Sequence, residues 1–412
     1  MIKSFINIFH VPELRKKLAF TCSLLLVYRL GGHVPVPGIE KDALKLMMAS
    51  FEGTILGLYD MFAGGFFSQA SIFALGIMPY ISASIIIQLL GSVVPYFQRL
   101  QKEGEDGRRK IIQLTRYGTV LISFLQAIGV AVFLANQEMS GAGKVVPNAD
   151  IMFYFVTIVT LVTGTVFVMW LGEKISDHGL GNGISLIIMV GILASAPHVF
   201  NIQLSYLMQG SINPITKAIP SLLLMIGITI FVVLVTTAVR KIPVQYAKRV
   251  VGRKVYGGQS THLPLKILTA GVMPIIFAQA LMFLPNTIGQ LFQGSIGNWV
   301  LTVFSPDHWF YALVLSIFIV IFTYFYTAIA FNPVDVADNM KKQGGFIPGV
   351  RPGRATSDYI DKILTRVTLP ASIFLAVVAI FPSILYGVFN QDISYSLVSF
   401  YGGTSLLIIV GV

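Results

Sequence analysis

The sequence has 412 residues, of which 55% are hydrophobic and 11% are charged, and it carries a formal net charge of +11 at pH 7. Soluble domains carry about 25% charged residues, so this composition excludes an ordinary soluble globular protein and indicates a polytopic membrane protein. The single cysteine, Cys22, excludes an intrachain disulfide and a site built from several thiolates.

The N-terminal segment, MIKSFINIFHVPELRKK, is amphipathic and ends in three basic residues. No small-residue cleavage site follows it, so we expect the adjoining apolar run to be retained as the first span. Ten apolar runs are long enough to cross a hydrocarbon core of about 30 Å. The predicted spans are 18–34, 71–95, 111–135, 151–171, 184–205, 218–239, 265–291, 309–331, 367–389 and 396–412. We expect the last span to be truncated at Val412.

The distribution of charge predicts the orientation of these spans. With the N-terminus in the cytosol, the outer segments hold four basic and eight acidic residues, and the rest of the chain holds 25 basic and 10 acidic ones. An excess of Lys and Arg in short loops marks the cytosolic side of a membrane protein. We therefore expect both termini to lie in the cytosol.

The ten spans divide into two sets of five. An odd number of spans per half places the second half upside down relative to the first, as in the inverted repeats of many transport proteins. The predicted halves are residues 1–205 and 206–412. This division rests on the number of spans, because the two halves share no convincing similarity at the level of residues.

Residues 55–70, ILGLYDMFAGGFFSQA, form an apolar stretch that is too short to cross the membrane and is broken by Gly64 and Gly65. Backbone can end at half depth in a membrane only where it is buried in protein or lines a cavity. The stretch is either an outer loop packed on the helices or a movable stopper within a pore. Its position directly before the second span favours the stopper.

The second span, GIMPYISASIIIQLL, changes character along one face. Ile77, Ile81, Ser84 and Gln88 fall within about 60° of one another on a helix. This face is therefore apolar at one depth and polar at the next.

The fifth span repeats the isoleucine spacing, with Ile184 and Ile188 one turn apart in GNGISLIIM. Isoleucine pairs are common in membrane helices, so neither pair alone is specific. Two such pairs, a polar stripe on the cytosolic side and a short re-entrant segment outside are together more specific. They predict a water-filled funnel that is closed at mid-depth by a hydrophobic constriction, which blocks ions by dewetting.

Two connections, residues 240–264 and 332–366, are longer than the joining of helices requires. Both are basic, rich in turn residues and predicted to be cytosolic. Enforcing topology needs only a few charges, so lengths of 25 and 35 residues favour a docking surface. Basic patches of this kind suit acidic protein faces, anionic lipid or RNA.

Motifs of catalysis and nucleotide binding are missing from the sequence. GLGNGIS, at 179–185, follows no strand and lacks a lysine–serine pair, so we expect no nucleotide site. The six histidines are scattered singly, without metal-ligand spacing. No carboxylate lies clearly within a span, which argues against an ion-coupled transporter. Arg29, in the outer half of the first span, is expected to be paired or to reach the outer surface. We expect neither enzymatic activity nor a cofactor.

Long and specific motifs occur along the chain: GIMPYISASIIIQLL, EGEDGRRKIIQLTRYGT, THLPLK, FNPVDVADNMKKQGGFIPGVRPG and GGTSLLI. They resemble the motifs of the bacterial SecY family, the central subunits of the protein-conducting translocon, and the resemblance covers essentially the whole chain. It implies an all-α polytopic membrane protein. Ten transmembrane helices in two inverted five-helix halves would surround a central pore of hourglass shape, with a short re-entrant plug.

The resemblance also implies roles for individual residues. The family's pore-ring positions fall on isoleucines, namely Ile77, Ile81, Ile184, Ile188, Ile276 and Ile408. Ser84 and Gln88 would then line the pore on its cytosolic side. The family's plug falls on about 57–69, and its central residues are Asp60, Met61, Phe62, Ala63, Gly64, Gly65, Phe66 and Phe67. The lateral gate would lie between spans two and three on one side and spans seven and eight on the other.

Arg351 is the main candidate for contact with a partner. It lies in IPGVRPG, where prolines and glycines form a stiff turn, and its guanidinium offers a rigid donor fork that a lysine cannot reproduce. It also matches a functionally important loop arginine of the family. Arg249, Arg253 and Lys254 on the other long loop would extend the same basic surface. The alternative is that Arg351 only satisfies carbonyl groups of its own loop.

The function implied by the resemblance is a channel in the bacterial plasma (inner) membrane. It would move unfolded preproteins that bear signal sequences across the membrane and release apolar segments sideways into membrane lipid. Because no nucleotide site is expected, the energy would come from the SecA ATPase motor or a translating ribosome, with the SecE and SecG subunits bracing the channel. A small-solute secondary transporter and a non-conducting membrane scaffold are the rival classes; the missing midplane carboxylates disfavour the first and the polar stripe the second.

Overall fold

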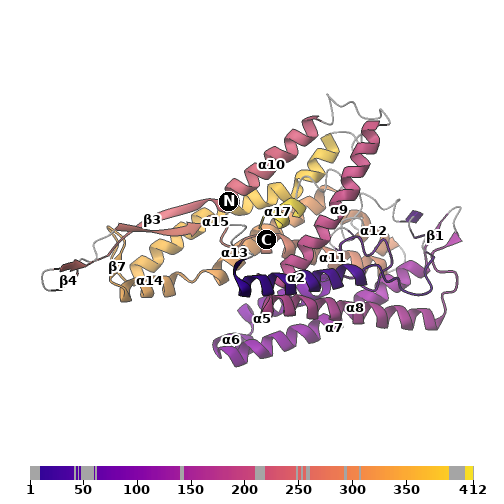
Figure 1. The fold of residues 1–412 in the computed structure, drawn as a ribbon, viewed down its shortest axis with the longest axis horizontal. Coiled ribbons are helices and arrows are strands. Elements are labelled where there is room, and N and C mark those ends of the chain that lie inside the picture. Colours follow the sequence, from indigo (N-terminus) through magenta and orange to yellow (C-terminus); the bar gives the residue numbers. More distant parts are fainter. Residues whose placement is uncertain are drawn as a thin grey trace.

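The computed structural model places most of the chain in helices (Figure 1). The residues that it describes are 10–40, 43–44, 46–47, 60, 63–139, 143–208, 219–246, 249–251, 254–256, 260–291, 295–305, 308–388 and 404–411. Predictions that concern the remaining residues, including Met61, Phe62 and Arg253, lie outside the described residues.

A described helix falls on each of the ten predicted spans. These helices are α2 (Pro12–Gly31), α5 (Met78–Val93), α7 (Glu105–Ala135), α8 (Ile151–His178), α9 (Gly183–Met208), α10 (Ile219–Thr237), α11 (Met273–Leu291), α13 (Trp309–Ala330), α15 (Arg354–Val388) and α17 (Thr404–Gly411). Among the described residues, four helices are long and apolar enough to cross a membrane by themselves, and α5 with the following α6 (Pro95–Lys102) makes a fifth, bent span. The protein is therefore mostly helical and polytopic, as the composition predicts.

Two predicted spans begin too early. Residues 71–77 form turns before α5 begins at Met78, and residues 267–272 form turns before α11 begins at Met273. In both helices a proline, Pro79 or Pro274, is the second residue. Proline suits the first turn of a helix, where its missing N–H is not needed, so these prolines mark the true starts.

Proline also explains the bend between α5 and α6. Val94 has an extended backbone (φ −91°, ψ 121°), and the two helix axes meet at 101°. The residue before a proline is pushed out of the helical region, and Pro95 follows Val94 directly. The chain therefore leaves the second span sharply at this point.

The two long connections are more ordered than turn-rich loops. The strands β3 (Val239–Tyr246) and β6 (Ser260–Lys266) pair antiparallel, from Val239 opposite Lys266 to Gln245 opposite Ser260. A short strand, β7 (Gly345–Phe346), pairs with the other edge of β3, so the two connections share one sheet. Figure 1 shows this sheet projecting at one end of the molecule beside α14 (Pro333–Lys342).

The predicted connection 332–366 is partly helical at its C-terminal end. α15 begins at Arg354, which is well before the predicted start of the ninth span at 367. Ile360 and Leu364 of this segment are buried together with Ile242, Val244 and Met340. This small core, outside the main bundle, explains why an amphipathic extension of the helix is stable there.

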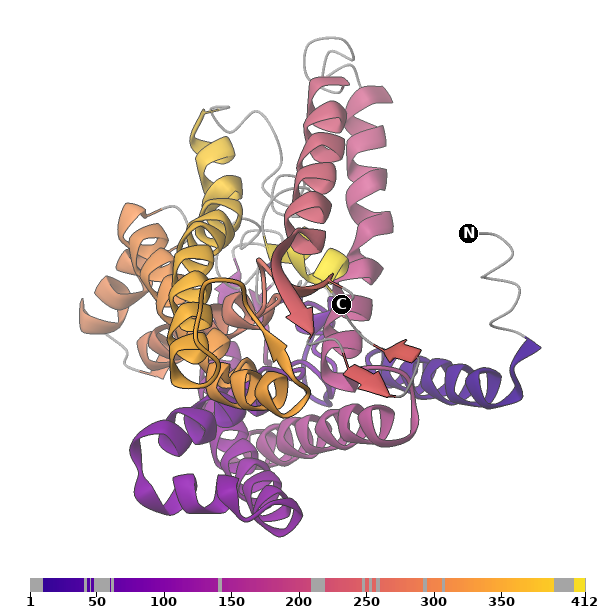
Figure 2. The ribbon, with the colours of Figure 1, turned by 90° about the vertical axis from the view of Figure 1, so that its left-hand side faces the viewer.

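Short elements complete the fold at the opposite end. β1 (Glu138–Met139) and β2 (Gly143–Lys144) form a hairpin, which Figure 1 shows far from the sheet of β3. α12 (Ser295–Val303) follows α11 and packs against it. Figure 2 shows the same helices from the end that carries the sheet.

One hydrophobic core joins the two halves of the chain. It contains buried residues of α2, α5, α8 and α9 from the first half and of α11, α13, α15 and α17 from the second. α11 packs against both α5 and α7, and α17 packs against α9 and α10. The contact of α11 with α5 and α7 lies where the resemblance implies a lateral gate.

Candidate functional site: an isoleucine cluster, a pinned segment and a basic end

The six candidate pore-ring isoleucines lie in one hydrophobic cluster. Ile77 stands at the N-cap of α5 and Ile81 one turn later; the others come from α9, α11 and α17. The exposed fractions of Ile77, Ile81, Ile188, Ile276 and Ile408 are 3%, 3%, 2%, 3% and 0%, and Ile184 is half-buried against the same cluster. Segments that are far apart in the sequence therefore contribute these six side chains, the isoleucine cluster, to one buried core, which also contains other isoleucines such as Ile85, Ile187 and Ile275.

The polar stripe on α5 follows this cluster. Ser84 and Gln88 are half-buried, whereas Ile77 and Ile81 are buried. The side-chain amide of Gln88 donates a hydrogen bond to the Ser84 hydroxyl at 3.1 Å. Burial thus decreases along the face as its side chains become polar.

The central part of the predicted plug is a tight turn closed by Asp60. Its Oδ1 accepts hydrogen bonds from the backbone N–H groups of Phe67 at 2.8 Å and Ser68 at 3.0 Å. Gly64 and Gly65 both have positive φ, +82° and +78°, which glycine adopts without steric cost. The Gly64–Gly65 pair that breaks the apolar run in the sequence is therefore what allows this turn.

The turn is buried against the helices. Ala63, Phe66 and Phe67 are 1%, 0% and 4% exposed. A β-carbon on Gly64 would lie 3.0 Å from the Cα of Gly191 in α9, so the two backbones touch directly. The segment 63–67 is thus packed against the helices, as both predicted alternatives, a packed outer loop and a stopper, require.

Two side chains of α2 hold this turn. The Arg29 guanidinium donates a hydrogen bond from Nη1 to the Gly64 carbonyl at 2.9 Å, and its Cζ lies 5.0 Å from the centre of the Phe66 ring. The Tyr28 hydroxyl donates to the Ala63 carbonyl at 3.4 Å, and its ring meets the ring of Phe66 edge to face at 5.1 Å. Arg29 is therefore paired, but with a carbonyl oxygen and a ring instead of an acid.

The end of α2 is shaped to receive the Phe66 ring. A side chain at Gly32 would overlap the ring of Phe66, and one at Gly31 would overlap the ring of Phe73. The sequence RLGG at 29–32 thus combines a cation with space for two aromatic rings. An arginine in an apolar run next to paired glycines was the available sequence signal, but it did not reveal the partner.

The candidate docking residues lie at the end of the molecule that carries the sheet. Arg351 follows β7, between Gly349 (φ +83°) and Gly353 (φ +104°), and it is exposed. Its carbonyl accepts a hydrogen bond from the Thr356 hydroxyl at 2.9 Å, which fixes the turn. Within the part of the chain that the structure describes, its guanidinium makes no ion pair or hydrogen bond.

The two other basic candidates that the structure describes, Arg249 and Lys254, belong to a separate hairpin. β4 (Arg249–Val251) and β5 (Lys254–Tyr256) pair antiparallel, with Val251 opposite Lys254. Figure 1 places this hairpin beyond β3, at the tip of the projecting end. Arg249 and Lys254 are thus on the same end of the molecule as Arg351.

No metal site emerges from the described residues, in which no group of three His, Cys, Asp or Glu side chains is placed to hold an ion. The described residues thus combine a buried apolar core, a segment held against it by α2, and a polar face on α5.

Comparison with known proteins agrees with this architecture. A family model described as SecY matches residues 71–412. The protein translocase subunit SecY of Escherichia coli (strain K12) is 46% identical over 402 residues, covering 97% of this chain and 89% of that protein.

Two solved structures share the fold at low sequence identity. One is a SecY structure, described by the role of the plug domain in stabilising the closed state of the translocation channel and maintaining a membrane seal. Its TM-score is 0.63 at 18% identity. The other is Sec61 in the canine ribosome-channel complex from the endoplasmic reticulum, with a TM-score of 0.60 at 18% identity. Both matches cover 96% of this chain and 89% of the other chain.

Proposed function

The chain belongs to the SecY family and is a protein-conducting channel subunit of a translocase, and from this premise we propose which residues form its pore, its plug and its partner surface. It is a multi-pass membrane protein and a transporter, not an enzyme. The observation that supports the proposal is that six isoleucines from four separate elements all pack into the core that the two halves of the chain share.

The isoleucine cluster is the constriction through which an unfolded polypeptide passes. Branched apolar side chains make no directional bonds, so they can part around a chain of any sequence and close again behind it. Four elements, α5, α9, α11 and α17, supply these side chains. Small movements of the two halves relative to each other would open the constriction. Apolar segments of the translocating polypeptide would pass sideways into the lipid between α11 and the pair α5 and α7, which are in contact in this conformation.

The turn at 63–67 is the plug of the resting channel. It is buried, and in addition to the packing of Phe66 and Phe67 it is held by hydrogen bonds from α2 that can break without unfolding a helix. A charge-assisted hydrogen bond such as that from Arg29 to the Gly64 carbonyl contributes about 1.5–3 kcal/mol. This is enough to favour the closed position, and it is small enough for an entering polypeptide to displace the plug.

The projecting end that carries Arg351, β4 and β5 is the cytosolic docking surface. The exposed Arg351 guanidinium donates no hydrogen bond to any described residue. Its donors are therefore available to a partner with carboxylate, phosphate or carbonyl acceptors. We assign to this surface the SecA motor and the ribosome, with SecE and SecG bracing the helices. The structural likeness to a channel named as part of a ribosome complex supports the ribosome in particular. Both termini of the chain would then lie in the cytosol of a bacterial cell, whose inner membrane holds the channel.

An ion-leak measurement tests the pore assignment. Ile81→Ser combined with Ile188→Ser should wet the constriction and raise the conductance of resting channels in planar bilayers. The matched control is Ile85→Ser with Ile187→Ser, which alters two neighbouring buried isoleucines of the same helices, 1% and 0% exposed. Conductance that is unchanged in the first variant, or raised equally in both, would contradict the assignment.

A further inference from the structure

Ala70, which follows the turn at 63–67, has an unusual backbone conformation. Its φ is +46°, and among the described residues it is the only one other than glycine with a positive φ. A residue with a β-carbon is less stable in this left-handed conformation than in the right-handed one, whereas glycine adopts it without steric cost. The chain is therefore strained at the residue where it leaves the turn.

Two backbone hydrogen bonds impose this conformation on Ala70. The N–H of Ser71 donates to the Phe66 carbonyl at 3.0 Å, and the N–H of Ala70 donates to the Phe67 carbonyl, also at 3.0 Å. This pair of bonds is the Schellman pattern, in which the residue at the place of Ala70 is left-handed and is most often glycine. Alanine at this position keeps both bonds but bears the strain.

The backbone after Ala70 is fixed on two sides. The Ala70 carbonyl accepts a hydrogen bond from the N–H of Val36 at 2.7 Å, and the N–H of Ile72 donates to the Val34 carbonyl at 3.0 Å. On the other side, a side chain at Gly164 of α8 would overlap the Ile72 carbonyl, so the two backbones are in direct contact. The chain from Ala70 onward is therefore anchored between α8 and the segment that follows α2.

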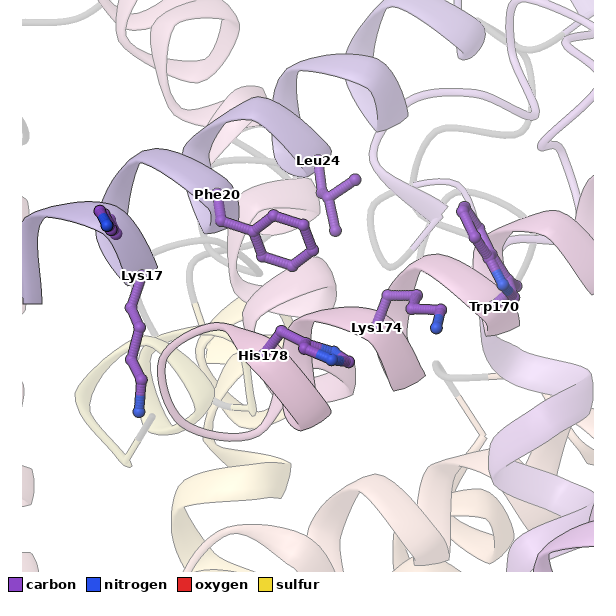
Figure 3. A pocket seen from close by; sticks show the side chains of 7 residues that line it. Lys17, Phe20, Leu24, Trp170, Lys174 and His178 are labelled. Atoms are coloured by element: carbon purple, nitrogen blue, oxygen red, sulfur yellow. The ribbon is translucent and has the colours of Figure 1, made fainter. Parts of the chain in front are cut away.

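Aromatic packing adds to this anchor. The ring of Phe73 stacks on Tyr28 of α2 at 6.0 Å and on Phe167 of α8 at 5.8 Å. Phe167 in turn stacks on Trp170 at 5.8 Å, and Figure 3 shows Trp170 extending from α8 at the edge of a cavity that lies between α2 and α8. Side chains as well as backbone thus tie the residues after Ala70 to these two helices.

We propose that Ala70 is the hinge of the plug and that its strained conformation favours release of the plug. This inference rests on the proposed assignment of the turn at 63–67 as the plug. Before Ala70 lie contacts that release must break, such as the hydrogen bonds from Tyr28 and Arg29, and after it lie the contacts of the anchor. Rotation of Ala70 into the right-handed region would break the bond from Ser71 but would relieve the strain. The strain thus offsets part of the cost of release.

The accessibility of residue 63 measures release of the plug in the reconstituted full chain. Ala63 is 1% exposed, so in a channel with Cys22→Ser and Ala63→Cys the new thiol reacts with a membrane-impermeant maleimide only when the turn leaves the bundle. When the plug recloses faster than the thiol reacts, the rate of labelling is proportional to the population of released plug. Ala70→Gly in this background should slow labelling by about fivefold or more, because removal of the strain stabilises the closed plug.

The matched control is Ala74→Gly. Ala74 is 2% exposed and lies in the same hydrophobic cluster as Ala70, but its φ is not positive. Glycine at position 74 relieves no strain and only adds conformational freedom, so labelling at position 63 should not slow. A second reporter, Leu75→Cys in place of Ala63→Cys, replaces a side chain beyond the hinge that is 1% exposed, and it should stay unlabelled while position 63 reacts.

Three results would overturn the proposal. The first is labelling at position 63 that is no slower with Ala70→Gly than in the parent. The second is equal slowing by Ala74→Gly, which would indicate a general effect of glycine in this cluster. The third is labelling at position 75 together with position 63, which would mean that the whole segment opens instead of turning at residue 70. Failure of the plug assignment is distinguishable, because position 63 would then stay protected even in a channel that holds an arrested preprotein.

Discussion

Arg29 and Arg351 carry the same guanidinium, but the molecule uses the two groups in opposite ways. Arg29 donates to the Gly64 carbonyl at 2.9 Å and lies 5.0 Å from the centre of the Phe66 ring. Arg351 is exposed on a stiff turn, and its guanidinium makes no ion pair or hydrogen bond to any described residue. A guanidinium whose donors are used within the chain stabilises one conformation of that chain, whereas one with unused donors is available to another molecule. Substitutions at these two positions should therefore affect different steps of transport.

Reversal of charge at Arg351 should give the largest effect. In Arg351→Glu we expect normal insertion and assembly, but motor-driven or ribosome-coupled transport into vesicles should fall by about tenfold or more, because like charges would then face each other in the docked complex. Resting ion leak should not change. Lys144→Glu, which reverses an exposed charge near the opposite end of the molecule, should transport normally. Normal transport by the Arg351→Glu channel would rule out the docking role.

Removal of the Arg29 guanidinium should weaken closure of the resting channel but should not reduce transport driven by the motor or the ribosome. Arg29→Leu loses a charge-assisted hydrogen bond and a cation–π contact, together about 2–4 kcal/mol, so the plug should leave its closed position more often. We expect a several-fold rise in resting ion leak and easier acceptance of preproteins with poor signal sequences. Arg29→Lys keeps the charge and should show a smaller rise. If both variants seal as tightly as the parent, Arg29 does not hold the plug.

A pair of glycines can refine this result with a smaller expected effect. Gly64 and Gly65 both have positive φ, so alanine should strain the backbone similarly at each position. Only at Gly64 would the added carbon press against other groups, with the Cα of Gly191 at 3.0 Å and Nη1 of Arg29 at 3.2 Å. Gly64→Ala should therefore raise resting leak above the level of Gly65→Ala. Equal leak in the two variants would mean that backbone strain, and not contact with α9 and Arg29, governs closure.

The sequence predicts well where helices occur, since a described helix falls on each of the ten predicted spans, because long apolar runs depend on local composition. It predicted their ends less well. The turns at 71–77 and 267–272 are as apolar as the helices that follow, and only Pro79 and Pro274 mark where the helices begin. The early start of α15 depends on packing of Ile360 and Leu364 against a sheet, which the sequence alone did not reveal.

The sheet and the plug contacts show a second limit of sequence reasoning. The basic, turn-rich sequence of the segments that form β3 and β6 predicts a loop. In the structure these segments are paired strands, and alternate residues such as Ile242 and Val244 face one core. The partners of Arg29 and Tyr28 lie 35 residues further along the chain, and a single sequence gives no direct information on such contacts. Spacing alone picks out Ile77, Ile81, Ile184 and Ile188, and the family resemblance adds Ile276 and Ile408; that the six form a pore ring stays a prediction.

The most direct test is to ask which side chains a polypeptide touches while it crosses. A preprotein with one cysteine is arrested during transport through a channel with Cys22→Ser and one new cysteine, either Ile81→Cys in the isoleucine cluster or Leu121→Cys on the exposed face of α7, where Leu121 is 62% exposed. Disulfide formation between preprotein and channel is then measured under mild oxidation. The channel assignment predicts a strong crosslink at position 81 and none at position 121. Efficient transport with a crosslink at 121, or without one at 81, would contradict passage through the isoleucine cluster.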